Sequence, residues 1–165
     1  MSEEKNVNVK TRVFPPEVLL EEYRKLLLEE PGISELPLVI SGNSMSPFLI
    51  GGRDTVYLSR VERPLRRGDA VLYRRKSGGY VLHRIYRISE AGITMVGDAQ
   101  TVLEHGIRPD QIIAIVTRAE RKGKLLAPGN FWWFFFEKIW IRLVPFRRFL
   151  GKLFTFFWNR FQKKS

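Results

Sequence analysis

The chain of 165 residues contains no cysteine and only two histidines, His83 and His105. Without cysteine, neither disulfide bonds nor thiolate metal ligands can form, and the redox compartment is left open. One histidine beyond a catalytic one is too few to build a metal site. We therefore expect no metal or other cofactor, and we expect His105 to be a solvent-exposed loop residue.

Long apolar runs are also missing. No uninterrupted apolar run of about 18 residues or more occurs, so we do not expect a conventional membrane-spanning helix. Residues 1–11 are polar and lack the apolar region of a secretory signal peptide. The length allows one folded unit with appendages rather than two full domains.

Positive charge and aromatic residues are concentrated near the C-terminus. Of the formal net charge of +11, residues 131–165 carry +7, from eight Lys/Arg and one Glu, which leaves +4 in residues 1–130. All four tryptophans and ten of the twelve phenylalanines lie between Phe131 and Phe161. The basic character of the chain is therefore largely a property of its aromatic tail.

The tail is amphipathic when it is drawn as a helix at 100° per residue. Its polar side holds Glu137, Lys138, Arg142, Arg148, Lys152, Asn159 and Arg160, and Arg147 is the main exception on the apolar side. The apolar side holds Trp132, Trp133, Phe136, Ile139, Trp140, Leu143, Leu150, Phe154, Phe157 and Trp158. This pattern predicts a peripheral helix at an anionic membrane surface, kinked or split at Pro145. Packing on the body and an oligomer interface are the alternatives; nucleic acid is not expected, because cations and aromatics are segregated.

The preceding sequence predicts a mainly β body with one helix before it. Apolar residues recur at helical spacing over 17–30, after Pro15-Pro16, which predicts an amphipathic helix. Short β-branched or aromatic runs predict strands at 36–40, 55–59, 70–75, 80–88, 93–96 and 112–119, with a hairpin loop at Ser77-Gly78-Gly79. The expected organisation is a leader and helix at 1–35, a β domain at 36–121, a linker at 122–130 and the tail at 131–165.

A serine, a histidine and acidic residues follow one another in the β region. Ser44 lies in Gly42-Asn43-Ser44-Met45-Ser46-Pro47, and His83 follows 39 residues later in Val81-Leu82-His83-Arg84-Ile85. Asp98 lies in Gly97-Asp98-Ala99-Gln100, and Glu104 follows it. A serine hydroxyl becomes an effective nucleophile when an imidazole takes its proton, and a carboxylate can fix the tautomer of that imidazole.

With the Gly51-Gly52-Arg53-Asp54 turn and the block Leu65-Arg66-Arg67-Gly68-Asp69-Ala70-Val71-Leu72-Tyr73, these motifs resemble the type I signal peptidase superfamily over residues 38–118. The histidine at position 83, where many bacterial members have lysine, matches the archaeal and endoplasmic-reticulum subgroup. The resemblance implies a serine endopeptidase on the coiled β fold that signal peptidases share with self-cleaving SOS-type repressors.

The resemblance also implies a role for each matching residue. Ser44 is expected to be the nucleophile and His83 the general base. The Ser44 amide contributes to the oxyanion hole, with Gly42 and Met45 beside it. Asp98 is favoured as the residue that orients His83, and Glu104 is the alternative. Asp54 and Asp69 are expected to be turn residues.

The sequence therefore predicts a serine endopeptidase that cleaves a peptide or precursor protein at a membrane surface, on the cytoplasmic side. The alternatives are a catalytically silent, membrane-docked adaptor on the same scaffold and a cationic lipid-binding protein. A self-cleaving repressor is not favoured, because residues 1–36 are too few for a DNA-binding domain and a cleavage segment.

Overall fold

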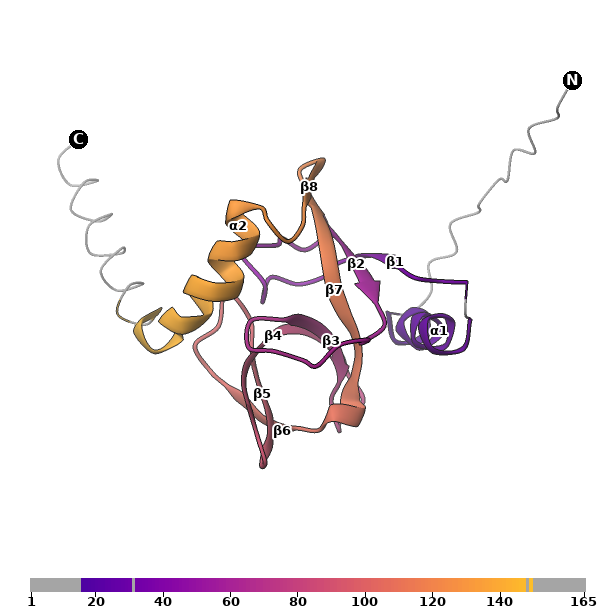
Figure 1. The fold of residues 1–165 in the computed structure, drawn as a ribbon, viewed down its shortest axis with the longest axis horizontal. Helices are drawn as coiled ribbons and strands as arrows, with labels where there is room; N and C mark the ends of the chain where they lie inside the picture. Colours follow the sequence, from indigo (N-terminus) through magenta and orange to yellow (C-terminus); the bar gives the residue numbers. More distant parts are fainter. Residues whose placement is uncertain (1–15, 31, 148, 150–165) are drawn as a thin grey trace, which may run out of the picture.

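The computed structural model describes residues 16–30, 32–147 and 149, and its centre is an antiparallel sheet (Figure 1). The eight strands are β1 (Leu36–Val39), β2 (Thr55–Ser59), β3 (Ala70–Arg74), β4 (Tyr80–Ser89), β5 (Gly92–Val96), β6 (Glu104–Ile107), β7 (Ile112–Arg121) and β8 (Lys124–Leu126). Their order in the sheet is β1-β2-β7-β3-β4-β5-β6, and β8 pairs with β7. The prediction of a mainly β body is confirmed.

The predicted N-terminal helix is present as α1 (Pro16–Glu29). Pro16 suits the first position of a helix, where its missing amide has no partner to lose. Leu27 is fully buried in the main core, and the Tyr23 hydroxyl donates to the carbonyl of Pro37 in β1. The apolar face of α1 therefore packs against the body beside β1, and α1 and the C-terminal helix lie at opposite ends of the body in Figure 1.

Strand β3 lies in the interior and is buried on both faces. Ala70 and Leu72 belong to the main core, whereas Val71 and Tyr73 belong to a second apolar cluster with Ile85 and Met95. Alternate residues of a strand point to opposite faces, so β3 contributes to both clusters. Its antiparallel pairing with β4 sets Val71 opposite His83 and Tyr73 opposite Val81.

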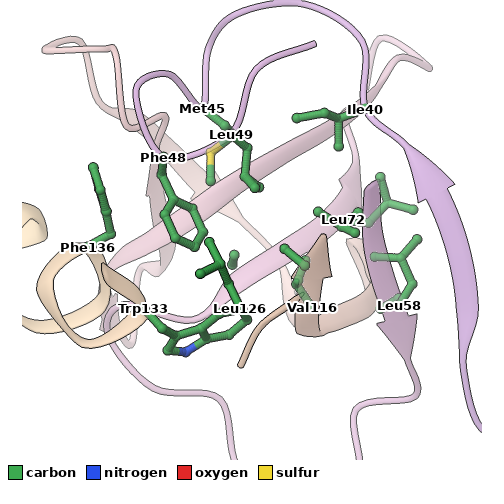
Figure 2. Packing of buried hydrophobic residues seen from close by; sticks show 14 of the residues in the cluster. Ile40, Met45, Phe48, Leu49, Leu58, Leu72, Val116, Leu126, Trp133 and Phe136 are labelled. Carbon is green, nitrogen blue, oxygen red and sulfur yellow. The ribbon is translucent and has the colours of Figure 1, made fainter. Parts of the chain in front are cut away.

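The first part of the tail packs on the body. It consists of α2 (Phe131–Phe134), the π-helical η2 (Phe135–Ile139) and the 3₁₀-helical η3 (Trp140–Phe146), which contains Pro145. Trp133 and Phe136 point into the main core, where their rings lie 5.9 Å and 4.9 Å from that of Phe48 (Figure 2). The prediction that Trp133 faces a membrane is therefore wrong, because this side chain is only 7% exposed.

Two short strands were not predicted. β8 occupies residues that we expected to be a linker, and it pairs with the end of β7, so residues 122–126 of that linker complete a hairpin continuous with the sheet. β6 contains His105, which is exposed as expected but lies in a strand rather than a loop. β6 is four residues long and mostly polar or glycine, and β8 has only three residues, so neither strand carries enough of the pattern that identifies a strand.

Candidate active site

Ser44 lies in the tight loop between β1 and β2. Met45 on one side of it is 3% exposed and belongs to the main core, which anchors the loop. The loop closes on itself so tightly that a Cβ atom at Gly51 would collide with the backbone of Gly42. Gly42 itself has a φ of +73°, which a side chain would disfavour. The sequence around Ser44 therefore fixes its backbone while its side chain stays half-buried.

The carbonyl of Ser44 is held by a second turn. The amide of Ala99 donates to it at 2.8 Å, and Gly97 packs so closely that a Cβ there would collide with the same oxygen. The turn is itself tied to the C-terminal helix, because Arg147 Nη1 donates to the carbonyls of Gly97 (2.9 Å) and Gln100 (2.8 Å). No hydrogen bond of the described chain uses the Ser44 amide as donor, so this group is available to an oxyanion.

Ser44 and His83 line the same cavity, of about 430 Å³. His83 lies on β4 and is 2% exposed. The lining is completed by α1, β1 and the hairpin strands: Leu20, Leu38, Val39, Ile40, Ser41, Gly42, Met45, Leu72, Arg75, Tyr80, Val81, Leu82 and Gln100. The structure records no hydrogen bond between Ser44 and His83; such bonds often form only when substrate is bound.

Asp98 does not contact His83, and its favoured role as the orienting acid is wrong. Both of its carboxylate oxygens accept from Nε of Arg84 at 3.0 Å, and both side chains are almost completely buried. Arg84 follows His83 directly on β4, so the two side chains point to opposite faces of the sheet. A carboxylate that pairs with Arg84 is therefore on the wrong face to reach His83.

The alternative acid, Glu104, lies on the side of His83 but is joined to it through a third residue. The Tyr73 hydroxyl is 3.2 Å from Nδ1 of His83 and 2.7 Å from Oε2 of Glu104. Arg75 holds the same carboxylate with two hydrogen bonds, of 2.8 and 2.6 Å. Neither Tyr73 nor Arg75 was identified from the sequence as a functional residue.

The environment changes the acidity of these groups. Burial lowers the pKa of His83 to about 4, while the charge of Glu104 opposes that change. The hydrogen bond from Arg75 holds the pKa of Glu104 below its ordinary value, and burial raises that of Tyr73. Burial also raises the pKa of Asp98, against the opposing charge of Arg84. At neutral pH the site therefore holds an uncharged imidazole, a neutral phenol and an ionised Glu104.

Asp54 and Asp69 are turn residues, as predicted. The carboxylate of Asp54 accepts from the amide of Ile50 at 2.8 Å, and that of Asp69 accepts from the amide of Arg66 at 2.8 Å. Within the described residues, no group of three His, Cys, Asp or Glu side chains is arranged to hold a metal ion. A larger cavity of about 580 Å³ lies against the C-terminal helix, but it contains neither Ser44 nor His83.

The residues predicted to bind a membrane have different environments. Trp132 is 49% exposed, whereas Trp140 is half-buried and donates to the carbonyl of Asp98 at 2.8 Å. Arg148, Lys152, Phe154 and Trp158 lie outside the described residues. Among the described residues of the C-terminal segment, the exposed large apolar ones, which we call the aromatic surface, are Phe131, Trp132, Phe134, Ile139, Phe146 and Phe149. None of the helices in the described ranges is long and apolar enough to cross a membrane.

Comparison of the chain with protein-family models, with curated proteins and with solved structures gave no match. The site is therefore interpreted from its own residues.

Proposed function

We propose that this chain is a serine endopeptidase of the signal-peptidase type. The observation that carries the proposal is that Ser44 and a buried, uncharged His83 line one cavity. An uncharged imidazole can accept the proton of a serine hydroxyl, and a cavity walled by Leu38, Ile40 and Leu72 can hold a small apolar side chain of a substrate. The resemblance of the sequence motifs to that superfamily supports the same reaction.

In the proposed reaction, Ser44 Oγ attacks the scissile carbonyl while His83 takes its proton. The resulting tetrahedral oxyanion is stabilised by the Ser44 amide. His83 then gives the proton to the leaving amine, and an acyl-enzyme forms. Water, activated by the same imidazole, hydrolyses the acyl-enzyme and releases the second product.

The peptide is proposed to bind as an added strand along β1. This strand is at the end of the sheet order, so one of its edges has no partner strand among the described residues. Leu38, Val39 and Ile40 belong to β1 or follow it directly, and all three line the cavity. Pro37 has no amide and its carbonyl accepts from Tyr23, so an extended peptide would pair with the remaining backbone groups of this edge and place a side chain in the cavity beside Ser44.

The cleavage is proposed to take place at a membrane surface to which the chain binds peripherally. The aromatic surface consists of six exposed large apolar side chains from one segment, and exposed Trp and Phe side chains suit the boundary between water and lipid. It belongs to a segment with a net charge of +7, so an anionic lipid surface complements it in both polarity and charge. A catalytically silent adaptor would bind the membrane through the same surface, so membrane binding does not distinguish it from a peptidase and cleavage must be measured directly.

The test is to incubate the wild type, Ser44→Ala and Ser46→Ala with a library of extended peptides on anionic vesicles, and to read the products by mass spectrometry. Ser46 lies in the same loop, so its variant controls for disturbance of the loop. We expect cuts by the wild type and Ser46→Ala, and a loss of roughly 10³-fold or more in Ser44→Ala. Cuts that persist in Ser44→Ala would refute the assignment of the nucleophile. Folded, vesicle-bound wild type that cuts no peptide would favour the adaptor.

A further inference from the structure

The hydroxyl of Tyr73 bridges His83 and Glu104 inside the protein. Tyr73 is fully buried on β3, and the β3–β4 register places it diagonally across from His83, which a tyrosine side chain can span. Glu104 reaches the same hydroxyl from the start of β6. Tyr73 does not line the cavity that holds Ser44. Its influence on the reaction is therefore indirect, and its one direct contact with the predicted catalytic pair is the one to His83.

The hydrogen atoms in this bridge can be counted. A phenol has one hydrogen to donate, and an ionised carboxylate can only accept. At 2.7 Å, the short bond to Glu104 uses the single hydrogen of Tyr73. The hydroxyl oxygen can then only accept from His83, so Nδ1 of His83 must carry the hydrogen in the 3.2 Å contact. Nε2 is left with a lone pair, as a general base requires.

Arg75 fixes the direction of the hydrogen bonds in this bridge, from His83 to Tyr73 and from Tyr73 to Glu104. Its two hydrogen bonds, of 2.8 and 2.6 Å, hold Glu104 in its ionised, acceptor-only form. Were Glu104 protonated, it could donate to Tyr73, and the hydrogen of Tyr73 could point to His83 instead. The opposite tautomer of His83 would then be favoured, with Nε2 blocked by a proton.

We propose that Tyr73 is a positioning residue that transmits the charge of Glu104 to His83 and thereby holds the imidazole in its Nδ1–H tautomer. This inference deepens the proposed function and rests on it for its catalytic consequence. In the usual triad a carboxylate contacts the imidazole directly. Here a tyrosine is interposed, and Glu104 with Arg75 sets the direction in which its hydroxyl points.

The tautomer can be measured without any substrate. We would label the full chain with ¹⁵N-histidine and record the imidazole nitrogen shifts at neutral pH, using His105→Gln to identify the signals of His83. The wild type should show a protonated, pyrrole-like Nδ1 and an unprotonated, pyridine-like Nε2. In Tyr73→Phe, which keeps the buried ring and removes only the hydroxyl, Nδ1 should lose its preference for the hydrogen. An unchanged Nδ1–H signal in that variant would overturn the proposal.

The kinetic consequence is measured on a soluble peptide. Tyr73→Phe should lower kcat by roughly 10- to 100-fold, the loss expected when one hydrogen bond to a charged network is removed, with KM within about twofold. Glu104→Gln should lower kcat similarly, because it removes the charge and keeps the shape. Tyr80→Phe is the matched control, since Tyr80 lines the cavity and bonds Glu21 rather than His83, and it should leave the tautomer unchanged.

The two readouts separate failure of the inference from failure of the proposed function. A wild type that cleaves peptides, with Tyr73→Phe equal to it in both kcat and tautomer, would refute the role of Tyr73 alone. A wild type that cleaves nothing, but whose Nδ1–H tautomer is lost in Tyr73→Phe, would refute the peptidase and support the hydrogen-bond bridge. Circular dichroism confirms in each case that the variant is folded.

Discussion

Trp132 and Trp133 are adjacent in the sequence but have opposite environments. Trp133 is 7% exposed, its ring lies 5.9 Å from that of Phe48, and its Nε1 donates to Glu137 at 3.0 Å. Trp132 is 49% exposed, and its ring contacts those of Phe131 and Phe135 in the same segment. Replacing each in turn by alanine therefore separates core packing from membrane binding within one segment.

The expected magnitudes differ severalfold. Trp133→Ala removes a buried indole, its edge-to-face contact with Phe48 and a hydrogen bond, so the free energy of unfolding should fall by about 3–5 kcal/mol. Trp132→Ala leaves no cavity in the core, and its free energy of unfolding should change by less than about 1 kcal/mol. Vesicle binding should respond in the opposite way, because the indole of Trp132 belongs to the aromatic surface and that of Trp133 does not.

Unfolding in urea, followed by far-UV circular dichroism, measures the stability of both variants, and cosedimentation with anionic vesicles measures their binding. The reasoning would be refuted if Trp133→Ala kept the stability of the wild type and lost vesicle binding. That result would mean that Trp133 leaves the core in solution and faces lipid. If the wild type and Trp132→Ala bound vesicles equally well, the proposal that the aromatic surface contacts lipid would be refuted.

Two further predictions concern the acidic groups and His83. The pKa of His83 is lowered from 6.5 to about 4 in the folded state, so between these pH values the unfolded chain binds more protons than the folded chain. The free energy of unfolding should therefore decrease as the pH is lowered below about 6.5. The groups that face His83 are Tyr73, Glu104 and Arg75. The contribution of His83 to this loss of unfolding free energy should reach about 3 kcal/mol near pH 4 and should be missing in His83→Gln. Equal losses in the wild type and in this variant would contradict the prediction. Asp98→Asn leaves Arg84 buried without its counter-charge and should cost about 3–5 kcal/mol of stability, whereas Glu104→Gln should mainly lower kcat. Urea unfolding and peptide kinetics measure the two effects. If Asp98→Asn mainly lowered kcat and Glu104→Gln mainly lowered stability, Asp98 would be the orienting acid after all.

The sequence was informative about the body because its strands are short runs of β-branched and aromatic residues bounded by turns. β2 has the predicted bounds, and Ser77-Gly78-Gly79 joins β3 to β4 as expected, with the amide of Arg75 donating to Gly79 at 2.8 Å. The C-terminal segment was harder to interpret. A stripe of Trp and Phe has the same periodicity whether it faces lipid or a core, so periodicity could not reveal that Trp133 fills the space beside Phe48.

The sequence also contained a signal for Tyr73 that the motifs alone did not reveal. Once the hairpin loop is fixed at 77–79, counting back along β3 and forward along β4 sets Val71 opposite His83. Position 73 then lies two residues along the same face, within reach of the imidazole. A tyrosine in an otherwise apolar strand needs a partner for its hydroxyl, so this register alone could have indicated a contact with His83. The pairing of that hydroxyl with Glu104 depends on β6 and required the structure.

The difference between the two candidate acids follows from a step of one residue along β4. His83 and Arg84 are consecutive, so each faces a different side of the strand and each is matched by a different carboxylate. Asp98 compensates the charge of Arg84, and the guanidinium group of Arg84 lies over the ring of Phe48 in the main core. Glu104 serves the other face, where Tyr73 and His83 lie. Asp98, the carboxylate closer to His83 in the sequence, is therefore not the one closer to it in space, and the strand register decides which acid can reach the His83 side of β4.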